Sequence, residues 1–141
     1  MKKLKFRAWD KDKRIMLSWE QIIHNTEMNL FGGLFELFRR EEIRAMQFTG
    51  LLDKHGEDIY EGDIVKRGVE MPEDYFAKFV IKYDGVLAQF RMFEINYNAK
   101  NNILATGEDI PYSCGAEKSQ RKREIEIGIL GNIHQNKDLI E

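Results

Sequence analysis

Apolar and polar residues alternate near the start of the chain, which is the pattern of a half-buried β-strand. The apolar positions are Leu4, Phe6 and Ala8, and they alternate with Lys5, Arg7 and Trp9. Residues 10–14 are polar and suit a turn, and residues 15–17 are apolar and long enough for a return strand. The pattern predicts a β-hairpin at the beginning of the chain.

The spacing then changes, and residues 19–45 form the only long region with a helical pattern. Trp19, Ile22 and Ile23 lie at positions i, i+3 and i+4, which places them on one face of a helix. A glycine pair that begins at Gly32 interrupts the pattern. We expect a short helical turn, a loop and a second short element.

The segment 30–38 is more apolar than a surface element requires. Its large apolar side chains are Leu30, Phe31, Leu34, Phe35, Leu37 and Phe38. A helix of this length buries only one face against its own domain, which leaves Phe31 and Phe35 beside that face. Symmetric oligomers cover such patches with the same patch of another copy. We predict a homo-oligomer that uses this segment; in the alternative, the same chain buries both phenylalanines.

The stretch 46–66 supplies the turns around which the later strands are arranged. Asp53 and Gly56 suit a tight reversal, because aspartate bonds downstream backbone amides and glycine accepts a positive φ. Strand-forming residues 59–60 follow, and the pattern is interrupted at 61–63 before it resumes. A turn that enters a strand in this way is typical of small five-stranded barrels of the SH3-like kind.

A second hairpin is predicted across residues 75–93. Asp84-Gly85 is a strong hairpin signal between two β-rich runs, 75–83 and 86–93. The face of the first strand that should point inward is wholly apolar: Ala77, Phe79, Ile81 and Tyr83.

The remaining segments complete the predicted fold. Residues 94–123 are rich in asparagine and glycine and read as a long loop, and residues 124–129 alternate as a strand before a turn at 131–134. The predicted class is α+β, an SH3-like β-barrel at about 46–141 preceded by the hairpin and short helices. We expect one domain over residues 1–141, with the hairpin and helical segment at 1–45 and the barrel-like part at 46–141.

Composition narrows the class of protein. A chain of 141 residues with 43% hydrophobic and 33% charged residues suits a soluble globular domain. The net charge of −2 gives no overall attraction to nucleic acid or to a membrane. The single cysteine, Cys114, allows no internal disulfide and suits a reducing compartment. Because no membrane span or signal peptide is recognisable, we expect a cytoplasmic protein with no membrane partner.

Charge is nevertheless uneven along the chain. Residues 1–14 hold seven Lys and Arg against Asp10 and Asp12, a local charge of +5. A second basic cluster is Lys118, Arg121, Lys122 and Arg123. The functional interpretation is a surface for phosphate or an acidic partner. The structural interpretation is a solvated strand face whose lysines block unwanted edge pairing.

Acidic residues are concentrated in residues 46–70. This stretch holds six Asp and Glu residues and only three Lys and Arg residues. The candidates are Asp53, Glu57, Asp58, Glu61 and Asp63. Paired carboxylates can act as acid and base or can hold Mg²⁺. On predicted turns we expect these side chains to point outward and to be solvated, with Asp63 free to fix its turn by bonding backbone amides.

The sequence contains no recognisable motif for metal binding, nucleophilic catalysis or phosphate binding. His24, His55, His134 and Cys114 lack the spacing of metal ligands, and neither HExxH nor CxxC occurs. Ser113 lacks the GxSxG elbow, and no phosphate-binding glycine loop is present. We therefore predict no catalytic, cofactor-binding or metal-binding residue, and no cofactor.

Three segments together resemble the YopX-like family of phage and prophage proteins. They are Phe6 to Asp10 (FRAWD), Thr49 to Val65 with the pattern TGL-D-G--IYEGDIV, and Gly131-Asn132-Ile133 followed by Asn136 and Leu139. Lys137 stands where the family often has proline, and residues 97–123 match nothing. The resemblance implies a fold and a phage or prophage origin in a bacterial host, but no established activity.

Two functions remain open from the sequence. The first is a phage accessory protein that acts as a non-catalytic interaction module for a protein or nucleic-acid partner. The alternative is a metal-assisted enzyme that acts on nucleotides or phage components through the acidic turns.

Overall fold

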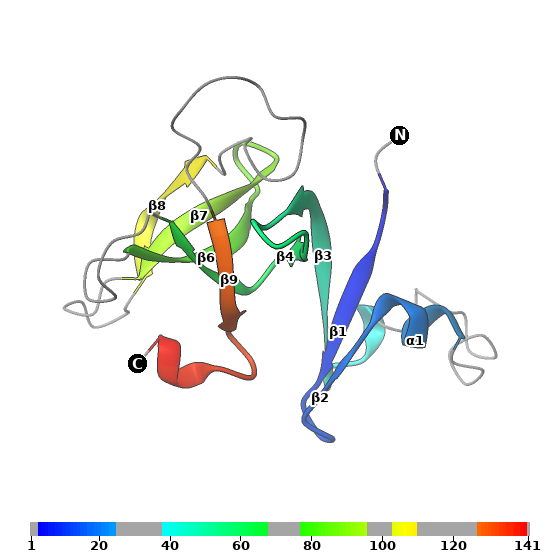
Figure 1. Ribbon diagram of the computed structural model, residues 1–141. Coiled ribbons are helices and arrows are strands. Elements are labelled where there is room, and N and C mark those ends of the chain that lie inside the picture. Colours follow the sequence, from blue (N-terminus) through cyan, green and yellow to red (C-terminus); the bar gives the residue numbers. More distant parts are fainter. Residues whose placement is uncertain (1–2, 25–37, 68–76, 96–102, 110–126, 141) are drawn as a thin grey trace. The chain divides into compact units, whose positions relative to one another are not determined.

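The computed structural model describes residues 3–24, 38–67, 77–95, 103–109 and 127–140 of the chain. Its strands form two antiparallel sheets, with the orders β2-β1-β3-β4 and β8-β7-β6-β5-β9 (Figure 1). The chain divides into two compact units, Met1–Phe48 and Thr49–Glu141. Strand β3, Ile43–Leu52, begins in the first unit and ends in the second.

The first unit contains the predicted N-terminal hairpin. Strands β1 (Phe6–Asp10) and β2 (Ile15–Leu17) pair with Trp9 opposite Met16, and β1 pairs on its other side with β3. The Asp10 carboxylate accepts hydrogen bonds from the backbone N–H groups of the next turn, which fixes the reversal. The hairpin prediction is confirmed.

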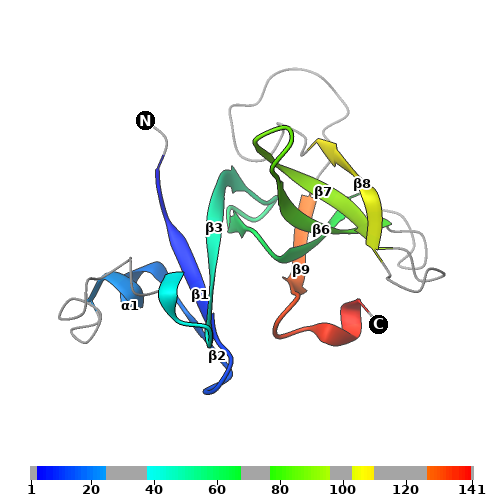
Figure 2. The same ribbon diagram turned by 180° about the vertical axis from the view of Figure 1, so that it is seen from behind.

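The helix α1 (Trp19–His24) covers one face of this sheet (Figure 2). Ser18 and Gln21 form a capping box, in which each side chain accepts the other's backbone N–H. The helical spacing at the start of the 19–45 region is therefore confirmed, whereas its second element lies largely outside the described residues. The small core beneath the helix consists of Ala8, Ile22 and Ile43, with Leu17 and Trp19 packed against it.

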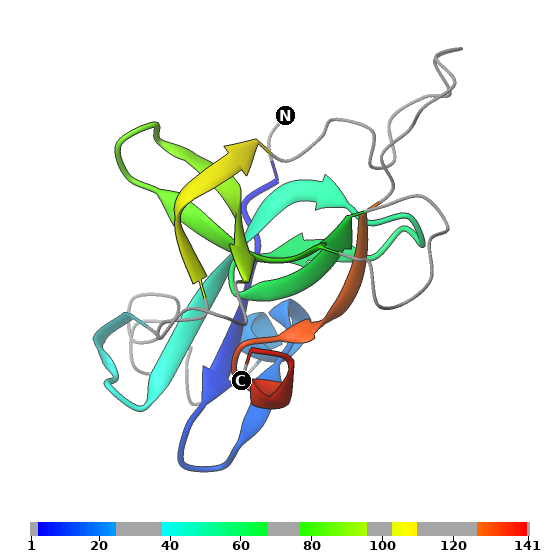
Figure 3. The same ribbon diagram turned by 90° about the vertical axis from the view of Figure 1, so that its left-hand side faces the viewer.

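The second unit carries the five-stranded sheet, which is strongly curled (Figure 3). Its elements are β4 (Asp58–Tyr60), β5 (Asp63–Arg67), β6 (Ala77–Asp84), β7 (Gln89–Ile95), β8 (Ile103–Asp109), β9 (Ile127–Asn132) and the 3-10 helix η2 (Lys137–Leu139). Strand β4 belongs to the other sheet, beside β3. The interrupted strand predicted at 59–65 is confirmed as β4 and β5.

The two faces of the five-stranded sheet have separate apolar clusters. One face buries Ile59, Val65, Phe79, Ile81, Met92 and Ile127. The other face buries Ile64, Val80 and Ile95, against which Ile133, Leu139 and Ile140 of the C-terminal segment pack. Hydrophobic burial thus fixes the register of β5 and β6, because a slip of one residue would exchange the two faces.

The second hairpin differs from its prediction at the tip. Strand β7 begins at Gln89 instead of residue 86, and the connection has four residues between Asp84 and Gln89. The Asp84 carboxylate accepts the N–H groups of Val86 and Leu87, and Ala88 has a φ of 52°, which closes this longer loop. Tyr83 is also not inward: it is 50% exposed, because it lies at the loop end of β6 beyond the buried residues.

The long loop predicted at 94–123 is wrong for part of its length. Residues 103–109 form β8, which pairs with β7 across an irregularity between Phe93 and Ile95. The glycine and asparagine residues that suggested a loop include Gly107, which lies within this strand. Its small size is required there, since a Cβ would approach the Phe93 ring to 2.9 Å.

The fold is therefore mostly β-sheet, with two antiparallel sheets, one of them curled, and little helix among the described residues. The single-domain organisation predicted from the sequence stays a prediction. In the described part of the chain, no helix combines the length and apolar composition that a membrane span requires.

Candidate functional site

Asp53 organises the reversal between β3 and β4. It is only 3% exposed, and its Oδ1 accepts hydrogen bonds from the backbone N–H groups of His55 at 2.8 Å and Glu57 at 3.0 Å. Its Oδ2 accepts a third, at 3.2 Å, from the N–H of Ile129 in β9. Gly56 has a φ of 83°, which few other residues adopt without strain. One carboxylate therefore fixes its own turn and ties that turn to a strand far along the sequence.

This geometry favours the ionised form of Asp53. Burial raises the pKa of the carboxyl group, but hydrogen bonds from the N–H groups of Glu57, Ile129 and His55 lower it, with a smaller contribution from the His55 charge. The hydrogen bonds outweigh the burial, so the pKa of Asp53 lies below its usual value of 3.8. Asp53 is therefore a structural anion at neutral pH and is poorly suited to hold a proton for catalysis.

The lowered pKa predicts how stability depends on pH. Its contribution is fully present above the unfolded-state pKa of 3.8, and it is lost as pH falls through the lower folded-state pKa. Asp53→Asn keeps an acceptor oxygen but removes the charge. The difference in free energy of unfolding between wild type and Asp53→Asn should be constant above pH 5 or so and should shrink below that pH. Urea unfolding between acidic and neutral pH measures it; a pH-independent difference would contradict the assignment.

The second buried carboxylate closes the next turn. Asp63 is 1% exposed, and its Oδ2 accepts the backbone N–H of Tyr60 at 2.8 Å. Between them Gly62 has a φ of 81°, donates its N–H to the carbonyl of Ile81 and accepts the N–H of Ile133. The prediction that Asp63 fixes its turn by bonding backbone is confirmed.

A third turn follows β9 and uses side-chain amides in the same way. The Oδ1 of Asn132 accepts the N–H groups of His134 at 3.1 Å and Gln135 at 3.0 Å. The Oδ1 of Asn136 accepts the N–H of Asn132 at 3.1 Å. The Asn136 side chain lies where a Cβ on Gly131 would stand, so only glycine fits that position without displacement.

The acidic cluster suggested by the sequence is therefore not one site. The expectation that its carboxylates are solvated is wrong for Asp53 and Asp63, because both are buried acceptors of backbone N–H groups. Asp58 and Glu61 are half-buried, and Glu57 is exposed. Within the described ranges, no three His, Cys, Asp or Glu side chains gather as a metal ion would require.

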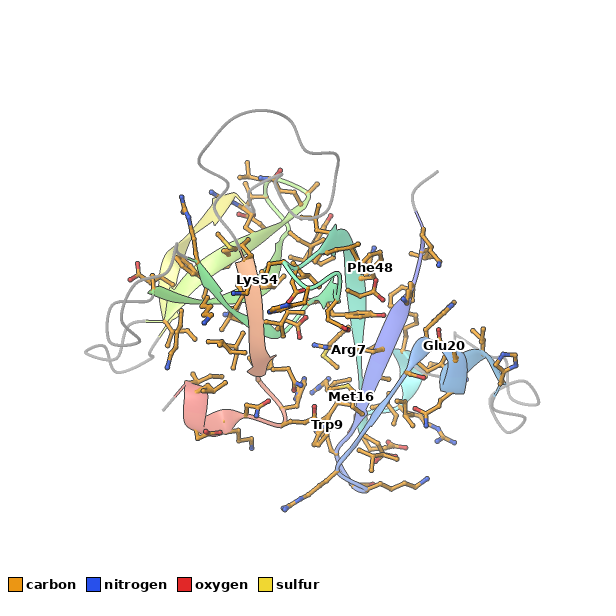
Figure 4. All side chains as sticks on the ribbon, viewed as in Figure 1. Arg7, Trp9, Met16, Glu20, Phe48 and Lys54 are labelled. Carbon is orange, nitrogen blue, oxygen red and sulfur yellow. The ribbon has the colours of Figure 1, made fainter. Side chains whose placement is uncertain are left out.

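The remaining sequence candidates differ in exposure, and several of them lie outside the described residues. His24 and His55 are exposed and His134 is half-buried, whereas Cys114, Ser113 and the basic cluster of residues 118–123 lie outside the described residues. In the N-terminal basic segment, the Lys5 ammonium lies 5.5 Å from the centre of the Phe48 ring. Arg7, Trp9 and Met16 extend from the sheet face away from α1 (Figure 4).

Sequence reasoning missed a basic surface in the second unit. Lys66 on β5 lies directly opposite Lys78 on β6, and Lys54 crosses the neighbouring strand β9 at Gly128. The alternation of Lys78, Val80 and Lys82 along β6 was a signal for one basic edge of this face. That Lys66 and Lys54 lie beside Lys78 could not be predicted without knowing the order of the strands in the sheet.

These turns coincide with the segments that resemble a known family. The YopX protein family matches residues 5–141 of the chain. The chain belongs to the YopX family. No curated protein matches it. Among solved structures, it is similar to the crystal structure of protein EF1440 from Enterococcus faecalis, with 23% identity, a TM-score of 0.58 and full coverage of both chains. That similarity concerns the fold alone.

The YopX signature in this chain is therefore a set of turn-forming contacts. Besides the aspartates, Thr49 donates its hydroxyl to the carbonyl of Ile59 at 2.8 Å and accepts the N–H of Leu51. The signature side chains Asp53, Asp63 and Asn132 accept backbone N–H groups. The motif explains how the fold is held together and assigns no reaction.

Proposed function

We propose that this YopX protein is a phage or prophage accessory protein that acts as a non-catalytic interaction module. The observation that supports this proposal is the use of the buried signature carboxylates, Asp53 and Asp63, as acceptors for backbone amides. A carboxylate whose oxygens already accept backbone N–H groups of the same chain is a weak candidate for binding Mg²⁺ or for proton transfer. We further propose that the curled sheet is an SH3-like barrel, a fold class that hosts many unrelated functions.

Metal titration separates the module from its alternative, a metal-assisted enzyme acting on nucleotides or phage components. We expect no saturable heat in calorimetric titrations of the full chain with Mg²⁺ or Mn²⁺, and no metal-dependent turnover of nucleotides. Asp58→Asn replaces a half-buried carboxylate of the acidic stretch and keeps the side-chain volume, and it should behave as wild type in both assays. Saturable binding that Asp58→Asn abolishes, together with turnover, would replace the module with the enzyme.

Self-association is a separate part of the proposal. We propose a homo-oligomer formed through residues 30–38, supported by their large apolar content and by Phe38, which is 59% exposed in the first unit. Phe38, the last residue of this segment, packs edge-to-face on the buried Phe6 ring of β1 at 5.5 Å between ring centres.

Sedimentation velocity over a wide concentration range tests the oligomer. We expect association in the micromolar range and a shift toward monomer in Phe31→Ser and Phe35→Ser, because burial of each ring is worth about 2–3 kcal/mol. Val86→Ser on the exposed hairpin tip is the control for loss of an apolar surface residue. A monomer at every concentration would contradict the proposal, and an oligomer that resists both serine variants would place the interface elsewhere.

A further inference from the structure

The hairpin formed by β6 and β7 extends beyond the strands that flank it in the second unit (Figure 3). On β6 the pairing with β5 ends at Val80, and on β7 the pairing with β8 ends at Arg91. Among the described residues, the two strands from residue 82 to residue 90 form β-pairs only with each other. This end of the hairpin is therefore a projecting element, and we call residues 82–90 the finger.

The apex of the finger is apolar, uncharged and exposed. Val86 is 93% exposed and Leu87 is 53% exposed, and Tyr83 behind them is 50% exposed. No charged side chain occurs in residues 85–90. Single exposed apolar residues are normal on a protein surface, but three of them together at the end of a projecting hairpin form a cluster of the kind that marks an interaction site.

Hydrogen bonds from the apex to a single carboxylate hold it in one conformation. Oδ1 of Asp84 accepts the backbone N–H groups of Val86 at 3.0 Å and Leu87 at 3.2 Å. Oδ2 of Asp84 lies 3.3 Å from Nη1 of Arg91, which anchors the carboxylate to the opposite strand. Ala88 completes the reversal with a φ of 52°. An ordered loop loses less conformational entropy on binding than a flexible one, so the apex is prepared for a partner.

The convex shape of the apex restricts what can cover it. Contact with the same apex of a second copy buries only about 100 Å² for each aliphatic side chain, whereas a stable interface needs about 800 Å² on each partner. A lipid surface also gains too little, because the side chains of Val86 and Leu87 hold about seven carbon atoms, half of a myristoyl chain that by itself binds membranes only marginally. A concave apolar pocket of a protein surrounds the apex and adds contacts along the flanks of the finger.

We propose that the finger inserts Val86 and Leu87 into an apolar pocket of a protein partner. The floor of that pocket carries no unpaired charge, because an inserted aliphatic side chain would remove water from it without replacing the hydrogen bonds. Tyr83 flanks the apex and stands edge-to-face on Phe90 at 5.3 Å between ring centres, so an amphipathic ring is available for the rim of the pocket. This inference rests on the proposed interaction module and names its class of partner and its surface.

Site-specific photocrosslinking tests the proposal, and the probe is the full chain with p-benzoylphenylalanine in place of Val86. The matched probe carries the same photoreactive residue in place of Ile23, which is 42% exposed on α1 in the first unit. In an extract of the cells that carry the chain's own gene, we expect the probe at position 86 to form a nuclease-resistant crosslink to another protein. The probe at position 23 should not form this product, and an excess of unlabelled wild-type chain should remove it.

Competition by unlabelled variants measures how much of the affinity comes from the apex. Leu87→Ser should need a roughly 10- to 30-fold higher concentration than wild type for half displacement, because it removes a buried anchor of the interface. The control Leu130→Ser removes a residue of β9 that is 36% exposed, and it should compete within about twofold of wild type. Asp84→Ala keeps both apolar side chains but removes the acceptor that orders them, so it should weaken competition about three- to tenfold. Thermal melts should show that every variant is folded.

A crosslinked protein supports the inference only if the wild-type chain displaces it and Leu87→Ser does so much less well. Equal competition by Leu87→Ser and wild type would overturn the pocket in favour of non-specific apolar adhesion. A product that contains only the chain itself, lipid or nucleic acid would also overturn it, as would the absence of any product from position 86. Absence of the product without metal-dependent turnover would leave the interaction module with a different surface. Metal-dependent turnover would instead remove the module itself, so the two failures are distinguishable.

Discussion

Replacement of Asp53 by alanine is expected to lower the free energy of unfolding by about 3–5 kcal/mol. The carboxylate is buried and accepts three backbone N–H groups, from His55, Glu57 and Ile129. Leaving a buried donor without its acceptor costs roughly 1–3 kcal/mol, and hydrogen bonds to a charged group lie in the upper part of that range. Water can reach the exposed turn at His55 and Glu57, so the total should stay below the simple sum.

Urea unfolding followed by tryptophan fluorescence and by far-ultraviolet circular dichroism measures this change. Glu57→Ala is the matched control, because it removes an exposed carboxylate from the same turn and keeps the backbone N–H that Asp53 binds. It should change stability by no more than about 0.5 kcal/mol. A loss under 1 kcal/mol in Asp53→Ala would mean that other acceptors replace the carboxylate and that the turn does not depend on it.

The local part of this turn could be predicted from the sequence. An aspartate followed by a glycine three residues later indicates a reversal whose side chain bonds the downstream backbone, and His55 and Glu57 supply those N–H groups. The third bond, to Ile129, joins residues 76 positions apart. No periodicity identifies such a partner, and for this reason the carboxylate was expected to be solvated when it is buried.

The basic surface formed by Lys54, Lys66 and Lys78 shows the same limit on what the sequence alone predicts. Alternation along β6 places Lys78 and Lys82 on one side, which is a property of a single strand. The juxtaposition with Lys66 depends on the register between β5 and β6, and that with Lys54 depends on β9 lying next to β5. The order of the strands depends on which apolar strand faces pack against one another, and this involves residues from the whole chain. The contacts that unite the candidate site are therefore non-local, whereas most of the strands that carry it could be predicted locally.

The errors at the second hairpin and in the long loop have different causes. The Asp84-Gly85 pair correctly marks the reversal, but Asp84 bonds Val86 and Leu87 and so selects a four-residue connection. In β8, Gly107 suggested a loop although glycine is needed for the ring of Phe93 to lie against the strand. Glycine thus marks a turn in one place and close packing in another, and the sequence pattern alone does not separate these uses.

Close packing also makes Gly131 the position with the second largest expected effect. Gly131→Ala should lower the free energy of unfolding by about 2–4 kcal/mol, from overpacking and from loss of a hydrogen bond. The new methyl group would collide with the Asn136 side chain, whose Oδ1 accepts the N–H of Asn132. Gly85→Ala is the matched control, because a Cβ there meets no atom within 4 Å. It should change stability by less than about 0.5 kcal/mol.

A double-mutant cycle then identifies the cause of the Gly131 effect. Asn136→Ala removes both the colliding side chain and the acceptor for the Asn132 N–H, so it should cost about 1 kcal/mol by itself. In that background Gly131→Ala should cost less than about 1 kcal/mol, which gives a coupling energy of roughly 1–3 kcal/mol between the two positions. Additive effects would show that alanine at Gly131 acts through the backbone. Coupling of the expected sign would tie the closing segment of the YopX signature to one steric contact, since the glycine is needed to leave room for the Asn136 side chain that closes the turn after β9.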